Sequence, residues 1–176
     1  MKKTLSLIVC FTLLLSIESF SQNYDIKKLK EKDPSLFSFV TDWLGTRYRF
    51  GGVTKSGIDC SAFTKTLYKL VFNTEIPRTA ESQWKEVKNK GKEVDKKDLE
   101  TGDLIFFRTR TATTWHVGVY LDSGYFVHSS NKKQGVIISN LDESKYKNKY
   151  LTAGKPIDTI KSKQIIQSKD TIWRNK

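Results

Sequence analysis

The chain has 176 residues, enough for one domain with its own hydrophobic core, and it carries a formal net charge of +12. A basic chain can bind nucleic acid, but this sequence has no nucleic-acid-binding motif and no alternation of arginine with aromatic residues. Attraction to an anionic cell-envelope surface, or simply a solvated lysine-rich face, accounts better for the charge. No repeat or linker divides the chain.

The first 21 residues are typical of a secretory signal peptide. Two lysines precede an apolar run (residues 5–17), and Ser19-Phe20-Ser21 offers a cleavage site between small residues. An apolar run of roughly 13 residues is short for a membrane span, and Cys10 lies too early for a lipidated start. We therefore expect an exported protein, cleaved near Ser21-Gln22, with no transmembrane segment in the mature chain.

Removal of the signal peptide leaves Cys60 as the single cysteine, so no internal disulfide is expected. An unpaired cysteine in an oxidising compartment is either buried as a small hydrophobic residue or used chemically. Composition alone leaves both interpretations open.

The first predicted helix begins after Asp33, an N-cap, has Pro34 at its first position and stops at Gly45. Its apolar residues recur at helical spacing: Leu36, Phe37, Val40 and Leu44. Residues 48–52 (YRFGG) are predicted to form a turn or loop.

A second helix is predicted from Cys60, with Asp59 as its cap, and a third follows Thr79 and ends before Gly91. The second has the stripe of a helix buried on one face: Phe63, Leu67, Leu70 and Val71.

The second half of the chain has the pattern of short strands separated by turns. Five runs rich in Val, Ile, Phe and Tyr predict an antiparallel meander of about five strands: residues 103–107, 116–121, 125–130, 135–141 and 152–157. Helices followed by strands indicate an α+β domain, in which the Cys60 helix is the best candidate to cover one face of the sheet.

The position of Cys60 at a helix start has a chemical consequence. Unpaired backbone N–H groups and the positive end of the helix dipole favour a thiolate there, and the same N–H groups can stabilise an oxyanion. The alternative is a cysteine that merely begins a buried helix.

The only two histidines, His116 and His128, lie on adjacent predicted strands. A three-residue loop (residues 122–124) pairs His128 with Gly118 and puts both histidines on one face, whereas a two-residue loop would separate them. One histidine can then take the proton of Cys60 while the other orients it. Gly118 is expected to leave open space beside His128. The other face is predicted to be apolar, with Val117, Val119, Leu121 and Val127.

Several motifs together resemble the NlpC/P60 family of cell-wall peptidases, and most closely its small spr-like murein endopeptidases. They are YRFGGVTKSGIDCSAF, IPRTAESQ, TGDLIFF, HVGVYLDSGYFVHSS, GVIIS and a late AGKPI, in order over roughly residues 35–157. The resemblance implies a permuted papain-like α+β fold. It also implies a triad of Cys60 as nucleophile, His116 as general base and His128 as the orienting residue, without metal or cofactor.

The resemblance further implies that Tyr48, Asp59 and Ser61 bind substrate, although packing or helix capping would also explain them. The family usually has glycine after DCS, where this chain has Ala62. We expect a signal peptide (1–21), an extension (22–34), a peptidase domain (35–157) and a basic tail (158–176).

The function that we expect is hydrolysis of amide bonds in peptidoglycan stem peptides by a monomeric cysteine peptidase. The bond would be D-γ-glutamyl to a diamino acid, or the D,D cross-link. A non-catalytic basic envelope-binding module, or an amidase or acyltransferase acting on another substrate, is the alternative.

Overall fold

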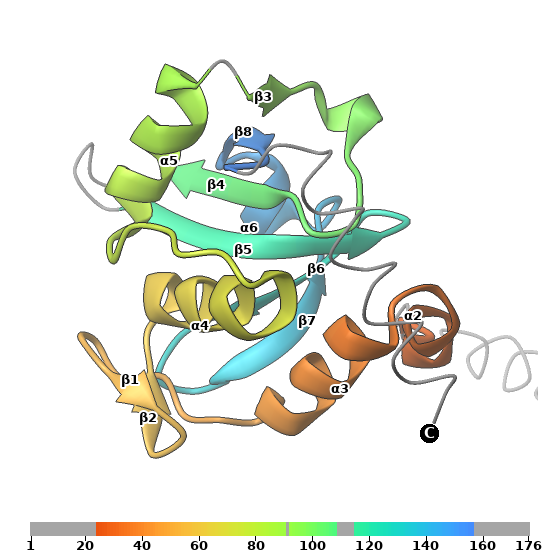
Figure 1. Ribbon diagram of the computed structural model, residues 1–176, viewed down its shortest axis with the longest axis vertical. Coiled ribbons are helices and arrows are strands. Elements are labelled where there is room, and N and C mark those ends of the chain that lie inside the picture. Colours follow the sequence, from red (N-terminus) through yellow and green to blue (C-terminus); the bar gives the residue numbers. More distant parts are fainter. Residues whose placement is uncertain (1–23, 91, 109–114, 157–176) are drawn as a thin grey trace, which may run out of the picture.

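The computed structural model describes residues 24–90, 92–108 and 115–156, which form an α+β fold with helices on both faces of an antiparallel sheet (Figure 1). The helices are Ile26–Lys32 (α2), Pro34–Trp43 (α3), Cys60–Phe72 (α4), Ala80–Asn89 (α5) and Ser144–Lys147 (α6). The strands are Val53–Thr54 (β1), Gly57–Ile58 (β2), Glu93–Val94 (β3), Leu104–Arg108 (β4), Trp115–Asp122 (β5), Tyr125–Ser129 (β6), Val136–Asn140 (β7) and Tyr150–Gly154 (β8). A 3₁₀ turn, Lys96–Asp98, follows β3.

The predicted N-caps are confirmed. Asp33 accepts from the backbone N–H of Leu36, Asp59 from Ala62 and Thr79 from Ser82. Each cap satisfies one of the N–H groups that a helix start leaves without an intrahelical partner.

The predicted apolar stripes need correction. In α3 the buried residues are Leu36, Phe39, Val40 and Trp43, whereas Leu44 is 39% exposed. In α4 Leu70 is 59% exposed, and Tyr68 is buried in its place. Both stripes keep the helical period but rotate, because large aromatic side chains occupy the centre of the interface.

The sheet has six strands in the order β3-β8-β4-β5-β6-β7, all antiparallel. The predicted meander is confirmed for β4 to β7, but β8 returns to the other edge of β4, and β3 pairs with β8. Strand β3 was not predicted because it lies in a lysine-rich stretch (residues 85–98) whose pattern suggests only a solvated face. A separate hairpin, β1-β2, was also missed within the glycine-rich approach to Cys60.

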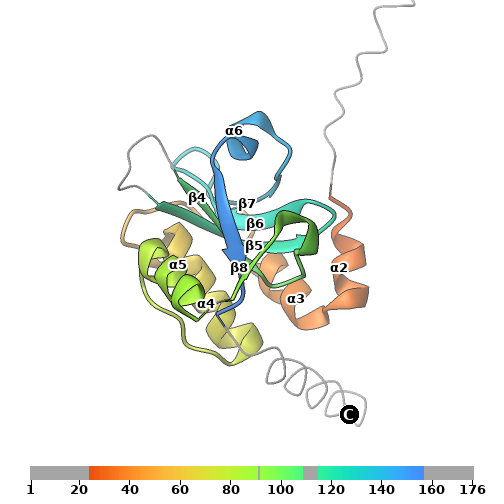
Figure 2. The same cartoon turned by 90° about the horizontal axis from the view of Figure 1, so that it is seen from above.

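Helices α2 to α5 cover one face of the sheet, and α6 lies on the other (Figure 2). The main core lies between the four helices α2, α3, α4 and α5 and one face of the sheet. That face carries four residues that are fully buried, as predicted: Val117, Val119, Leu121 and Val127. A smaller apolar cluster on the opposite face joins Ile105, Phe107 and Phe126 to Tyr146 of α6.

Helix α5 is held against the sheet beside His116 by two tryptophans. The rings of Trp84 and Trp115 stack with centroids 4.6 Å apart, and Lys88 and Arg108 lie over their faces. An aromatic stack of this kind adds to the burial of its own area.

The hairpin between β5 and β6 differs from the predicted loop but keeps its register. Asp122 pairs with Tyr125, so the turn has two residues, Ser123 and Gly124, both with positive φ. A bulge at Leu121 then restores the predicted pairing of Val119 with Val127. The extra residue lies in the strand instead of the loop, and the histidines still share a face.

The predicted signal peptide and basic tail lie outside the described residues. Residues 24–32 of the predicted extension include α2, whose Leu29 is fully buried in the main core. In the described part of the chain, no helix has both the length and the hydropathy to span a membrane.

Candidate active site

Cys60 is the first residue of α4 and is 8% exposed. The β1-β2 hairpin leads directly into it, and Ile58 forms a bridge with Tyr48 just before the helix. The residues with which the family resemblance begins are therefore wrapped around the start of α4.

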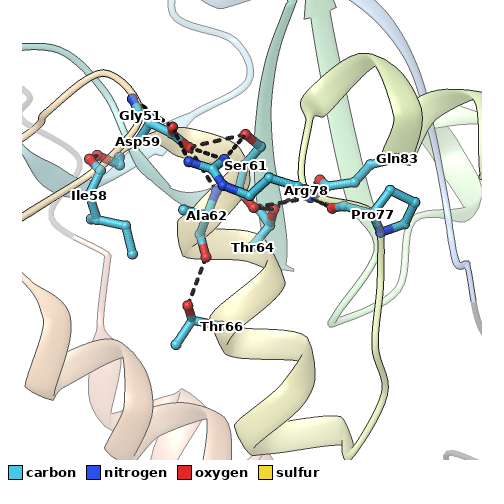
Figure 3. Close-up of polar contacts among 11 residues, drawn as sticks. Gly51, Ile58, Asp59, Ser61, Ala62, Thr64, Thr66, Pro77, Arg78 and Gln83 are labelled. Carbon is cyan, nitrogen blue, oxygen red and sulfur yellow. Dashed lines mark hydrogen bonds and ion pairs between the residues drawn. The ribbon is translucent and has the colours of Figure 1, made fainter. Parts of the chain in front are cut away.

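The start of α4 is held by a network centred on Asp59 (Figure 3). Arg78 donates two hydrogen bonds to its carboxylate, Nη1 to Oδ1 at 3.0 Å and Nη2 to Oδ2 at 2.6 Å. The backbone N–H of Gly51 donates to Oδ2 and that of Ala62 to Oδ1. Ser61 Oγ donates to Oδ1 and accepts from Arg78. Asp59 and Ser61 thus fix the loop and helix that carry Cys60.

The charge state of Asp59 follows from these contacts. Burial alone would raise the pKa of its carboxyl, but the hydrogen bonds from Arg78 and Ala62 outweigh burial and hold the pKa below its usual range. Asp59 is an anion at neutral pH, paired with a guanidinium.

A second brace comes from the fully buried Gln83 of α5. Its Nε2 donates to the carbonyl oxygens of Ser61 and Pro77, and its Oε1 accepts from Thr64 (Figure 3). The IPRTAESQ motif therefore supplies both Arg78 and Gln83 to the helix of Cys60.

Cys60 meets the sheet where β5 and β6 cease to pair. Their ladder ends at Val119–Val127, and beyond it Ser129 Oγ donates to the carbonyl oxygen of Ile58. The backbone N–H groups of Val117, Ser61 and Cys60 itself act on the Cys60 thiol, each lowering its pKa. One of these residues, Val117, is the neighbour of His116 in the chain.

The two histidines are in direct contact. Nε2 of His116 and Nδ1 of His128 are 2.7 Å apart, and the rings meet edge to face. His116 keeps some exposure, whereas His128 is fully buried. Because Nε2 of His116 is engaged, its Nδ1 is the nitrogen left to accept a proton.

Two hydroxyl groups hold His128 in turn. Its Nε2 lies 3.1 Å from Ser139 Oγ and 3.1 Å from the hydroxyl of Tyr146, and Ser139 donates to Tyr146. The GVIIS motif thus contributes Ser139. Tyr146 comes from α6, in a KYKNKY stretch whose sequence shows only a run of charge.

Gly118 does not leave the open space that its sequence position suggested. A β carbon there would lie 2.7 Å from the Phe126 ring and 3.2 Å from Cβ of His128. Phe126 and His128 fill the space that a side chain at position 118 would occupy. The glycine therefore lets both residues pack closely against β5.

Both reacting groups are neutral at pH 7. Burial raises the pKa of the Cys60 thiol to about 11, although the N–H groups of Val117 and Ser61 oppose this rise. Burial, with a contribution from the charge of Lys149, lowers the pKa of His116 to about 4. Burial therefore opposes the resting thiolate that the helix start predicts.

Burial also dominates at His128, whose pKa lies well below its usual value, with the neighbouring His116 and Lys145 adding to the effect. The pKa of Tyr48 is raised by burial and by the nearby Cys60 and Asp59. Tyr48 thus lies within electrostatic reach of the cysteine, next to the Asp59 network.

The family follows from the sequence together with this arrangement. The model of the NlpC/P60 family matches residues 45–155, which include Tyr48, Cys60, His116 and His128. This chain belongs to the NlpC/P60 family.

Its relatives are endopeptidases by name. The probable endopeptidase NlpC homolog of Haemophilus influenzae is 45% identical over 118 residues, which is 67% of this chain and 60% of that protein. Murein DD-endopeptidase MepS/murein LD-carboxypeptidase of Escherichia coli K12 is 39% identical over 133 residues, 76% of this chain and 64% of the relative. The chain therefore spans less than two thirds of the length of either relative.

The solved structures agree with the fold. The crystal structure of an NlpC/P60 family protein from Bacillus cereus ATCC 10987 matches with a TM-score of 0.62 and 32% identity, over 71% of this chain and 40% of that one. The NlpC/p60 domain of the peptidoglycan hydrolase SagA matches with a TM-score of 0.57 at 24% identity, over 69% of this chain and 97% of the domain.

Ala62, the departure from the usual NlpC/P60 pattern, is accommodated without disturbing the helix. It is 3% exposed, packs in the main core, and its backbone N–H caps onto Asp59. Alanine also has the highest helix propensity. Because this position is buried in the core at the start of α4, it is suited to a small residue such as alanine.

Proposed function

We propose that this NlpC/P60 protein is a cysteine-type endopeptidase that hydrolyses amide bonds in peptidoglycan stem peptides. The observation that carries the proposal is the 2.7 Å contact between His116 and His128, next to Val117, whose backbone N–H acts on the Cys60 thiol. The names of the relatives support the substrate, since they include murein and peptidoglycan endopeptidases.

In the proposed reaction, His116 is the general base and acts through Nδ1. Its Nε2 then carries the hydrogen and donates it to Nδ1 of His128. The hydrogen of His128 lies on Nε2, directed at the hydroxyls of Ser139 and Tyr146. This chain of hydrogen bonds fixes both tautomers, which is the part that an orienting residue plays in a catalytic triad.

The chemistry is nucleophilic substitution in two steps. The Cys60 sulfur attacks the amide carbonyl carbon as its proton passes to His116, and the backbone N–H groups at the start of α4 would stabilise the oxyanion. The C–N bond breaks as His116 returns the proton to the leaving nitrogen, which gives a thioester. Water activated by His116 then hydrolyses the thioester and releases the carboxylic acid.

Tyr48 and the Asp59–Ser61–Arg78 cluster would line the acyl side of this site. Tyr48 lies close enough to Cys60 for their charges to interact, and Arg78 keeps 38% of its side chain exposed at the edge of the cluster. The predicted signal peptide fits a substrate outside the cytoplasm, so we propose an exported enzyme.

Purified protein incubated with peptidoglycan, followed by mass spectrometry of the soluble fragments, tests the proposal. We expect fragments from the wild type and from the exposed control Ser35→Ala, and a loss of about 10³-fold or more in Cys60→Ala and His116→Ala. Identical fragments from wild type and Cys60→Ala would exclude cysteine catalysis. Binding without fragments would favour an envelope-binding module.

A further inference from the structure

A pocket of about 210 Å³ opens beside His116 on the face of the sheet away from α4. Its walls come from α6 and the residues after it, from the end of β4 and from the turn between β6 and β7. Neither Cys60 nor Asp59 nor Arg78 lines it. The pocket therefore extends the site from His116 in a different direction from the Asp59 cluster.

The charge of this pocket is positive. Lys145 and Lys149 both line the pocket, and within the described part of the chain no acidic residue lines it. Lys145 is partly neutralised, since Glu143 lies 3.0 Å from its Nζ and the Tyr146 ring lies beneath it. Lys149 forms no ion pair with an acidic residue within the described ranges, and its charge reaches His116.

The neutral polar residues of the wall add a donor. Gln134 Oε1 accepts from Asn131 Nδ2 at 2.8 Å and from Ser130 Oγ at 3.2 Å. With its oxygen occupied in this way, the Gln134 side chain has its NH₂ group left for a ligand. Two ammonium groups and an amide NH₂ form a wall of donors suited to a carboxylate.

The chemistry of the proposed reaction says which part of a substrate reaches this pocket. The general base of the attack step becomes the acid that protonates the leaving nitrogen, so the leaving group must lie against His116. A pocket that borders His116 without bordering Cys60 is next to the leaving nitrogen and its substituents.

We propose that this pocket is the leaving-group subsite, and that Lys149, with Lys145 and Gln134, binds a free carboxylate on the carbon that carries the leaving nitrogen. This assignment rests on the proposed endopeptidase function and deepens it. It selects diamino acids with a free carboxylate beside the scissile nitrogen over those whose carboxyl is amidated or absent.

The test uses two synthetic stem-peptide substrates that differ only in this carboxyl, which is free in one and amidated in the other. We expect the wild type to cleave the free acid with about tenfold higher kcat/KM, mainly through KM, as a charge-assisted hydrogen bond implies. Lys149→Met should bring the ratio for the two substrates close to one, Lys145→Met should lower it less, and Lys149→Arg should keep it.

The ratio between substrates is the chosen readout because Lys149 also acts on His116. Any effect of the substitution on the base itself changes both rates and cancels in the ratio. Lys147→Met, on the exposed side of α6 and outside the pocket, is the matched control and should keep the wild-type ratio.

The outcomes separate the two proposals. Equal cleavage of both substrates by the wild type, or an unchanged ratio in Lys149→Met, overturns the subsite and leaves the endopeptidase standing. Failure of the wild type to cleave either substrate, or peptidoglycan itself, overturns the proposed function and the subsite together.

Discussion

At the scale of single residues, Cys60 is subject to two opposing effects. Its place at a helix start and three backbone N–H groups favour the thiolate, whereas removal from water favours the thiol. Burial is the larger effect, because it raises the pKa to about 11. His116 is neutral as well, so the pair is suited to proton transfer during attack instead of a resting ion pair.

Alkylation of Cys60 by iodoacetamide should therefore depend steeply on pH. Because only the thiolate reacts, we expect the rate for the folded protein to keep rising beyond pH 10, without a plateau near neutrality. The urea-unfolded protein is the control: its rate should be half-maximal at about pH 8.5, the pKa of an ordinary thiol, and level off about one pH unit above that. A plateau below pH 8 in the folded state would mean that an ion pair with His116 outweighs burial.

The sequence can predict those site residues whose type and position within one predicted element already distinguish them. It cannot predict residues that reach the site only through tertiary packing. Cys60 and the histidines stand out because each type is rare in the chain and lies on a recognisable element. Ser139 and Tyr146 contact His128 only through the packing of β7 and α6, and no spacing in the sequence indicates that contact. Arg78 lies in the IPRTAESQ motif, but its contact with Asp59 joins residues 19 apart in the chain, and no local pattern predicts a contact of that kind.

At the scale of elements, the start of α4 is fixed by a connection between two segments. Arg78, just before α5, forms a two-pronged ion pair with Asp59, just before α4. A guanidinium has the planar geometry for this arrangement, whereas an ammonium group does not. The pair therefore joins the loop after α4 to the hairpin before it.

Replacement of Arg78 should destabilise the protein. Arg78→Ala leaves a carboxylate that is 6% exposed without its counter-ion, and we expect a loss of about 1–3 kcal/mol in the free energy of unfolding. The value lies below that of a fully buried pair because solvent reaches the Arg78 side chain. Arg78→Lys should recover part of the loss. Urea denaturation measures the change.

The control for this variant is Lys85→Ala, which removes an exposed ion pair with Glu81 on α5. An exposed pair at this spacing contributes less than about 1 kcal/mol. Equal losses in Arg78→Ala and Lys85→Ala would contradict a structural role for the Asp59–Arg78 pair.

The hairpin of the two histidines shows how far element-level prediction reaches. Residue counting along β5 and β6 predicts the pairing of Val119 with Val127 correctly, but it puts the extra residue in the loop. Ser123 adopts positive φ next to Gly124, and Leu121 is inserted into the core as a bulge. A local sequence pattern does not distinguish these two solutions, because core packing decides between them.

At the scale of the whole molecule, the sheet separates two environments. The face under α4 and α5 is the main apolar core, whereas the opposite face holds His128 in a smaller cluster closed by α6. That second layer keeps His128 fully buried and neutral. Folding therefore excludes a proton from a group that binds one readily when the chain is unfolded.

The stability of the molecule should consequently fall in weak acid. The pKa of His128 is lowered far below its unfolded value of about 6.5, so below that pH the unfolded state binds the additional proton. The free energy of unfolding should stay level above about pH 6.5 and drop by about 1.4 kcal/mol per pH unit below it, with His116 adding to the drop until about pH 4. Asp103 has the opposite sign because burial raises its pKa, whereas Asp59 contributes only at lower pH. Urea denaturation of wild type and His128→Gln at pH 7, 6 and 5 isolates this histidine, since the variant should lose about half of the slope and keep the part that comes from His116. A wild-type stability that is flat from pH 7 to pH 5 would show that the second layer admits a proton.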